Sequence, residues 1–141
     1  MFFYYFGNLF EFSVCLAALW VGGRDERIVS AAQLLNIAGY RLLSISFWSK
    51  PEWLVLAADV ALMLVLLTLA MRTTRWWLLW GAAFQLLIIV IHVAMIVDPS
   101  VRARSYATGT VIWAYLLLIA LAVGTWQAWR ERREARSQAS V

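Results

Sequence analysis

Apolar residues occur in long blocks along this chain, and short polar segments separate the blocks. A helix needs about 20 apolar residues to cross the hydrocarbon core of a bilayer, and these blocks have that length. Soluble helices would be shorter and amphipathic, and an outer-membrane barrel would show alternating segments of about 10 residues. We therefore predict an all-α integral membrane bundle with five transmembrane helices, and a four-helix bundle is the alternative. The predicted spans are about 2–21, 28–48, 53–71, 76–97 and 106–129.

Short polar breaks end the predicted helices. The first break is Gly22-Gly23 with the charged residues 24–27, the third is the charged segment 72–75, and the fourth begins at Asp98-Pro99. Such loops leave no room for a soluble domain, so residues 1–129 are predicted to form one transmembrane domain. Residues 130–141 are predicted to form a basic tail that continues the fifth helix and contacts anionic headgroups; a helix that docks a partner is the alternative.

Composition supports this class of protein. Hydrophobic residues make up 64% of the chain and charged residues 14%, and the mean hydropathy is +0.76. This leaves too few charged residues to cover a soluble domain of this size. The net charge of +4 comes from arginines that lie between and after the apolar blocks. Because that placement is typical of membrane topology, we expect the lipid bilayer as a partner and no nucleic acid.

The basic residues also predict the orientation. With five spans, the loops after the first and third helices share one side with the tail. That side carries eight cations, Arg24, Arg27, Arg72, Arg75, Arg130, Arg132, Arg133 and Arg136. The other side carries three, Lys50, Arg102 and Arg104. Since Lys and Arg are enriched in cytosolic segments, we predict a multi-pass protein of the bacterial inner membrane with its N-terminus outside and its C-terminus in the cytosol.

Four ionisable residues lie inside the predicted spans: Glu11, Arg41, Asp59 and His92. Such a group costs about 2.5–3.5 kcal/mol near the bilayer centre on insertion scales, so it normally faces a partner or a wet cavity. At a rise of about 1.5 Å per residue, all four fall in a shallow layer of one leaflet. They form a candidate intramembrane polar cluster.

Polar residues on the same helical faces extend this cluster. Gln33 and Asn36 share a stripe of the second helix, with Arg41 beside it, and Gln85 aligns with His92 on the fourth helix. Membrane helices turn small and polar residues toward one another. We therefore expect Asn36 and Gln85 to lie in a polar interior of the bundle.

Two interpretations of the cluster remain open. In the first, Arg41 pairs with Asp59 or Glu11, and the polar stripes hold the helices together. In the second, the surplus negative charge marks a site that handles protons or ions, or a pocket for a polar headgroup. The first needs no water, whereas transport requires access to water.

No residue pattern indicates catalysis, a cofactor or a metal. The HExxH, GxSxG, P-loop and dinucleotide-binding motifs are absent, and Cys15 has no second cysteine to pair with. We predict a non-enzymatic membrane component with a binding or accessory role, which self-associates or joins other membrane subunits. The alternatives are a small proton-coupled transporter or channel that uses the four ionisable residues, and a holin-like pore former.

Three segments carry a resemblance: Gly22-Gly23-Arg24-Asp25-Glu26-Arg27, Trp80-Gly81-Ala82-Ala83-Phe84-Gln85 and Asp98-Pro99. In these segments the chain resembles small bacterial polytopic membrane proteins that carry no assigned function. The resemblance implies the membrane class and no activity.

Overall fold

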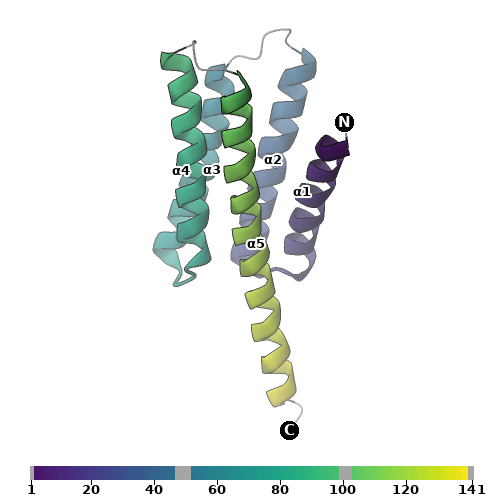
Figure 1. The fold of residues 1–141 in the computed structure, drawn as a ribbon. Coiled ribbons are helices and arrows are strands. Elements are labelled where there is room, and N and C mark those ends of the chain that lie inside the picture. The colour runs from purple at the N-terminus through teal and green to yellow at the C-terminus, as the bar shows by residue number, and fades with distance from the viewer. Residues whose placement is uncertain (1, 47–51, 99–102, 140–141) are drawn as a thin grey trace.

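The computed structural model describes residues 2–46, 52–98 and 103–139, and these residues form five α-helices and no strand. The helices are α1 (Phe2–Val21), α2 (Arg24–Ser46), α3 (Glu52–Arg72), α4 (Trp77–Val97) and α5 (Ala103–Ala139) (Figure 1). The predicted all-α class is confirmed, and each helix coincides with one predicted block. The last residues of the predicted second span, 47–48, and the cations Lys50 and Arg102 lie outside the described residues.

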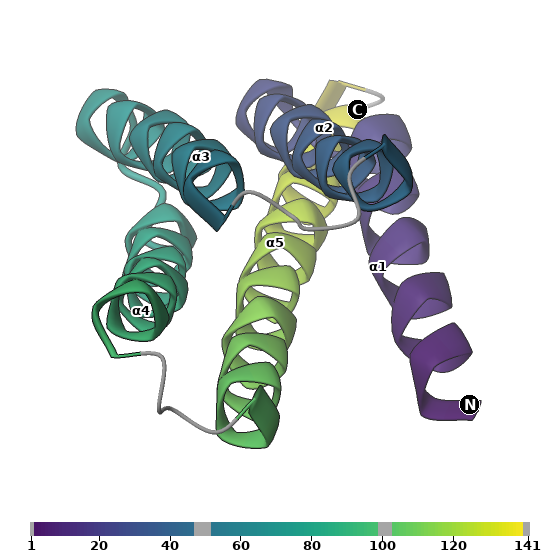
Figure 2. The ribbon, with the colours of Figure 1, turned by 90° about the horizontal axis from the view of Figure 1, so that it is seen from above.

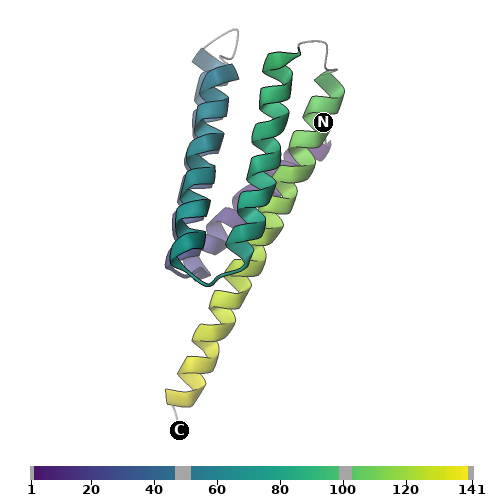
Figure 3. The same cartoon turned by 90° about the vertical axis from the view of Figure 1, so that its left-hand side faces the viewer.

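The five helices run alternately up and down. The α1–α2 and α3–α4 connections lie at one end, and α5 passes that end and continues beyond the other helices (Figures 1 and 3). In the described chain, α1 packs against α2 and α5, α3 against α2 and α4, and α4 against α5. α2 also contacts α5. The helices therefore form a ring that α5 closes, as the view from above shows (Figure 2).

Small and large apolar side chains fill the centre of this ring. The core includes Cys15 and Ala18 of α1, Leu66 of α3, Trp77 of α4 and Leu121 of α5, each 0–1% exposed. The Trp77 ring lies against α5 where Gly124 leaves room for it. A Cβ atom at Gly124 would lie only 2.4 Å from Cε2 of Trp77. This glycine thus permits the close approach of α4 and α5.

Three of the helices are long and apolar enough to cross a membrane: the segments Trp53–Arg72, Trp77–Val97 and Thr108–Ala139 of α3, α4 and α5. In α1, the apolar segment found within the described residues is shorter, Leu9–Val21. α2 is not among the helices that are apolar enough to cross a membrane by this measure. It starts four residues earlier than predicted because Asp25 and Glu26 form its first turn, where acidic side chains are favourable.

Three polar residues of α2 face inward. Glu26 and Ser30 are 0% exposed and Gln33 is 7% exposed. The outward face is apolar and follows helical spacing, with Ile28, Ala31, Leu35, Ala38 and Leu42 exposed. The low hydropathy of α2 therefore comes partly from its buried face and partly from its exposed arginines at positions 24, 27 and 41.

Large apolar side chains are exposed on every helix. Examples are Leu9 on α1 (67%), Leu35 on α2 (75%), Leu64 on α3 (57%), Val90 on α4 (53%) and Ile112 on α5 (50%). A soluble protein rarely surrounds itself with so much apolar surface. Hydrocarbon around the bundle would match this exterior.

Candidate functional site

The polar cluster predicted from the sequence is centred on Asp59 of α3, which is 7% exposed. Nδ2 of Asn36, on α2, donates a hydrogen bond to Oδ1 of Asp59 at 3.0 Å. Nε2 of Gln85, on α4, donates to the same oxygen at 3.0 Å and lies 3.3 Å from the main-chain oxygen of Asp59. Three helices thus meet at one carboxyl group.

His92 occupies the other side of this carboxyl group. Its Nδ1 lies 3.4 Å from Oδ2 of Asp59 and 2.9 Å from the main-chain oxygen of Ile88. Because a carbonyl oxygen only accepts, Nδ1 carries the proton in that hydrogen bond. Gln85 and His92 are seven residues apart on α4, which is about two helical turns, so both project from one face. α4 therefore supplies a contact to each carboxyl oxygen.

This arrangement is closed. Both carboxyl oxygens of Asp59 have polar contacts, and the side chains of Gln85 and His92 are also buried. A buried carboxyl group without partners would cost several kcal/mol, roughly the range found for unpaired polar groups in hydrocarbon. Here Asn36, Gln85 and His92 compensate for that cost.

Glu11 lies in a second, separate contact. It is half-buried on α1, and Nε2 of Gln33 on α2 lies 3.4 Å from its Oε1. Oε1 of Gln33 is buried, and no described residue is its hydrogen-bond partner.

Arg41 was predicted to pair with Asp59 or Glu11, and the contacts of the described residues do not include the pair with Asp59. Among the described side chains, those that contact Asp59 are Asn36, Gln85 and His92. Arg41 follows Asn36 by five residues, which places it about 140° further around α2, and its side chain is exposed. Of the six predicted residues, four therefore come together, whereas Glu11 on α1 and Arg41 on α2 are not among the described contacts of Asp59.

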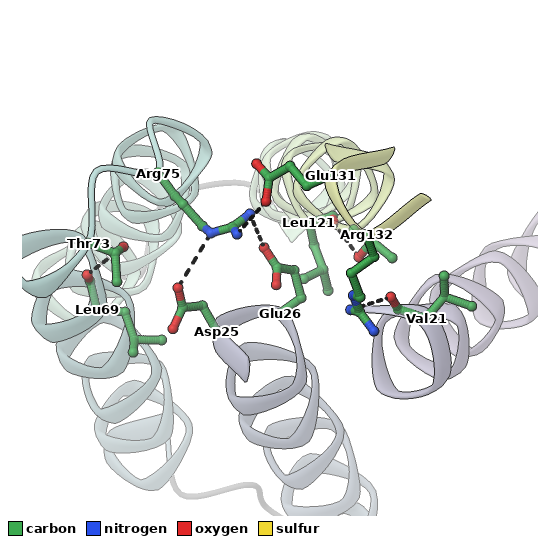
Figure 4. A network of polar contacts seen from close by, with 10 residues as sticks. Val21, Asp25, Glu26, Leu69, Thr73, Arg75, Leu121, Glu131 and Arg132 are labelled. Atoms are coloured by element: carbon green, nitrogen blue, oxygen red, sulfur yellow. Dashed lines mark hydrogen bonds and ion pairs between the residues drawn. The ribbon is translucent and has the colours of Figure 1, made fainter. Parts of the chain in front are cut away.

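A second polar network, which the sequence analysis did not predict, lies at the end that carries the α1–α2 and α3–α4 connections. Arg75, between α3 and α4, reaches three carboxylates with its three guanidinium nitrogens (Figure 4). Nη1 lies 3.3 Å from Glu26, Nη2 lies 2.9 Å from Glu131 and Nε lies 3.6 Å from Asp25. One arginine thus joins the start of α2 to the tail part of α5.

Glu26 is the buried member of this network. Its side chain is 0% exposed, and Gly23 makes room for it, since a Cβ atom there would lie 2.6 Å from its Oε2. Glu26, Ser30 and Gln33 follow one another at helical spacing on α2. Extending the polar stripe of Gln33 backward along α2 would have revealed Glu26 as an inward-facing residue.

The described residues hold no group of three or more His, Cys, Asp or Glu side chains that could bind a metal ion. Cys15 is fully buried, and its main-chain oxygen accepts a hydrogen bond from Ser30 at 2.7 Å. This bond joins α1 to α2 next to the core.

Comparison of the chain with protein-family models, with curated proteins and with solved structures gives no match.

Proposed function

We propose that the chain is a five-span protein of the bacterial inner membrane, with its N-terminus outside and its tail in the cytosol. Support for α2 as a span comes from its two faces, because Leu35 and Leu42 are exposed while Glu26 and Gln33 are buried. Only the outward face of a helix must match lipid, and on α2 an apolar stripe from Ile28 to Leu42 runs along this face. Support for the orientation comes from the eight cations on the side of the tail against three on the other.

We further propose that it is a non-enzymatic component with a binding or accessory role rather than a transporter. One observation carries this proposal, the closed contact set around Asp59. A proton or cation carrier needs an acid that reaches water. Asp59 is instead enclosed by Asn36, Gln85 and His92, so the cluster joins α2, α3 and α4.

One observation favours the alternative, a small proton-coupled transporter. Asp59 and His92 are two titratable side chains in contact at 3.4 Å. A carboxyl–imidazole pair can pass a proton if the bundle opens to water. The two proposals differ in whether water enters the interior.

Accessibility of Cys15 tests this difference, because Cys15 is buried in the same bundle interior. We expect a small water-soluble methanethiosulfonate reagent to leave Cys15 unmodified in intact membranes and to modify it after denaturation in SDS. Thr74→Cys, at an exposed position between α3 and α4, is the matched positive control and is expected to react at once. Rapid modification of Cys15 in the folded protein, together with proton uptake by reconstituted vesicles that Asp59→Asn abolishes, would favour the transporter.

A further inference from the structure

α1 and α5 leave an open apolar groove on the outside of the bundle. Its volume is about 410 Å³, and its walls include Phe10, Val14 and Ala17 of α1 and Ala122 and Trp126 of α5. The groove runs between two helices that contact each other, so α1 and α5 form its two walls and close it toward the bundle.

The two hydroxyl groups in this groove are already used by their own helices. The hydroxyl of Ser13 donates to the main-chain oxygen of Leu9 at 2.6 Å, and that of Thr125 donates to Leu121 at 2.8 Å. Neither hydroxyl proton is left to hold a polar ligand. The groove therefore suits a hydrocarbon chain.

A second pocket of about 370 Å³ continues the groove toward the tail. The two share Val21 at the end of α1 and Trp129 on α5. The second pocket is lined by Trp20, Arg132, Arg133 and Arg136 in addition to the shared residues. The apolar groove thus leads into a basic pocket lined by Arg132, Arg133 and Arg136, which we call the basic mouth.

The tail segregates its charges around α5. Its two acidic residues contact cations outside the basic mouth: Glu131 contacts Arg75, and Glu134 contacts Arg130. The three arginines of the basic mouth have no carboxylate partner within the described ranges. They lie at positions n, n+1 and n+4 of α5, which places them on one side of the helix.

Two of these arginines are held in place. Nη2 of Arg132 donates to the main-chain oxygen of Val21 at 2.7 Å, which satisfies a carbonyl at the end of α1. The guanidinium of Arg133 lies over the Trp129 ring, 5.2 Å from its centroid. The mouth is therefore a positioned cluster of positive charge next to interfacial tryptophans.

We propose that this groove binds one anionic phospholipid of the leaflet on the side of the tail. Its phosphate contacts Arg133 and Arg136, with Arg132 as the fixed base of the mouth, and one acyl chain lies along Val14 and Ala17. Guanidinium groups match phosphate oxygens in geometry and charge. A basic pocket at a helix–helix junction next to the headgroup layer is a site where anionic lipids are recognised. A zwitterionic lipid would leave the surplus charge of the mouth unbalanced.

This inference rests on the proposed membrane location. The first measurement is therefore carbonate extraction of membranes that contain the full chain. Release into the soluble fraction would overturn the membrane location itself. Retention in the pellet keeps that proposal and allows the lipid site to be tested separately.

Native mass spectrometry of the purified chain in detergent then tests the site, with dioleoyl-phosphatidylglycerol, dioleoyl-phosphatidylcholine and inorganic phosphate as three separate probes. We expect phosphatidylglycerol to bind about tenfold more tightly than phosphatidylcholine. The double variant Arg133→Gln/Arg136→Gln is expected to lose about thirtyfold in affinity for phosphatidylglycerol, as two neutralised surface cations imply. Both positions are exposed, so the fold should survive the change.

Two controls make the result specific. Arg130→Gln removes the same charge from the same tail, but Arg130 is paired with Glu134, and we expect a loss below about threefold. Ala17→Phe fills the groove and should weaken binding of phosphatidylglycerol, whereas Ala31→Phe, on the outer face of α2, should not. Equal losses for Arg130→Gln and the double variant would overturn the site in favour of general attraction to the tail. Equal binding of both lipids, or binding of inorganic phosphate alone, would also overturn it.

Discussion

One amide group of Gln85 contacts both the side chain and the main chain of Asp59. Nε2 of Gln85 lies 3.0 Å from Oδ1 and 3.3 Å from the main-chain oxygen of Asp59. Gln85 is 1% exposed, so no solvent can replace this amide if it is removed. Gln85 and His92 together connect α4 to Asp59 of α3 at this level, and Gln85 supplies the shorter contact.

We therefore expect Gln85→Leu to destabilise the bundle by about 1–3 kcal/mol, because Asp59 would lose a buried hydrogen-bond donor. A denaturant titration of the purified protein in detergent measures the free energy of unfolding. Thr68→Val is the control, since Thr68 is exposed on α3 and its hydroxyl donates to the main-chain oxygen of Leu64 in its own helix. Its effect should stay within about 0.5 kcal/mol. Similar losses for both variants would contradict the role of Gln85.

Arg75→Leu should destabilise the protein by about 2–3 kcal/mol, because Glu26 would remain buried without its cation. The expected loss lies below that of a fully buried pair, since the Arg75 side chain is 27% exposed. The comparison is Arg130→Leu, which breaks an exposed i,i+4 pair with Glu134 and should cost less than about 0.5 kcal/mol. Arg75→Leu combined with Glu26→Gln should recover part of the loss. If the double variant recovers no stability, the loss in Arg75→Leu does not come from the unpaired carboxylate of Glu26.

Gly124→Ala should destabilise the packing of α4 on α5 by about 1–3 kcal/mol, because the new methyl group would overlap the Trp77 ring. Gly39→Ala is the matched control, since a Cβ atom there meets nothing within 4 Å. That change should be neutral or stabilising by up to about 1 kcal/mol, as expected for glycine in a helix interior. Thermal unfolding followed by circular dichroism compares the two variants. An unchanged melting temperature for Gly124→Ala would mean that the packing of Trp77 on α5 does not require a glycine at this position.

Topology reporters test the number of spans. A reporter fused after Val141 should be active in the cytosol, and one fused ahead of Met1 should be active in the periplasm. The reason is the excess of cations on the side of the tail. A cytosolic reporter at both ends would leave four spans and would show that α1 does not cross the membrane.

The helices themselves were predictable from the sequence, because each apolar block is long enough to be recognised without its neighbours. The prediction of 2–21 matches α1, and the prediction of 76–97 differs from α4 by one residue. α2 was less predictable, since hydropathy averages over both faces and counts the buried Glu26 and Gln33 together with the exposed arginines of this helix. The level of a residue along the bundle was also predictable, because the rise per residue of a helix is constant. This places Asp59 and His92 in one layer, and they are in contact.

Partners were not predictable in the same way. Helical spacing identifies the stripe of Asn36, but the rotation of α2 against α3 decides whether Asn36 or Arg41 reaches Asp59. The network of Arg75 depends equally on the approach of α5, which lies far along the chain from α2. Taken alone, the sequence determined the all-α class, the helices and the polar stripes, because these follow from the length of the apolar blocks and from local periodicity. Only the tertiary structure decided which stripes meet, because helix neighbours and rotations are set by packing among residues that are distant in the chain.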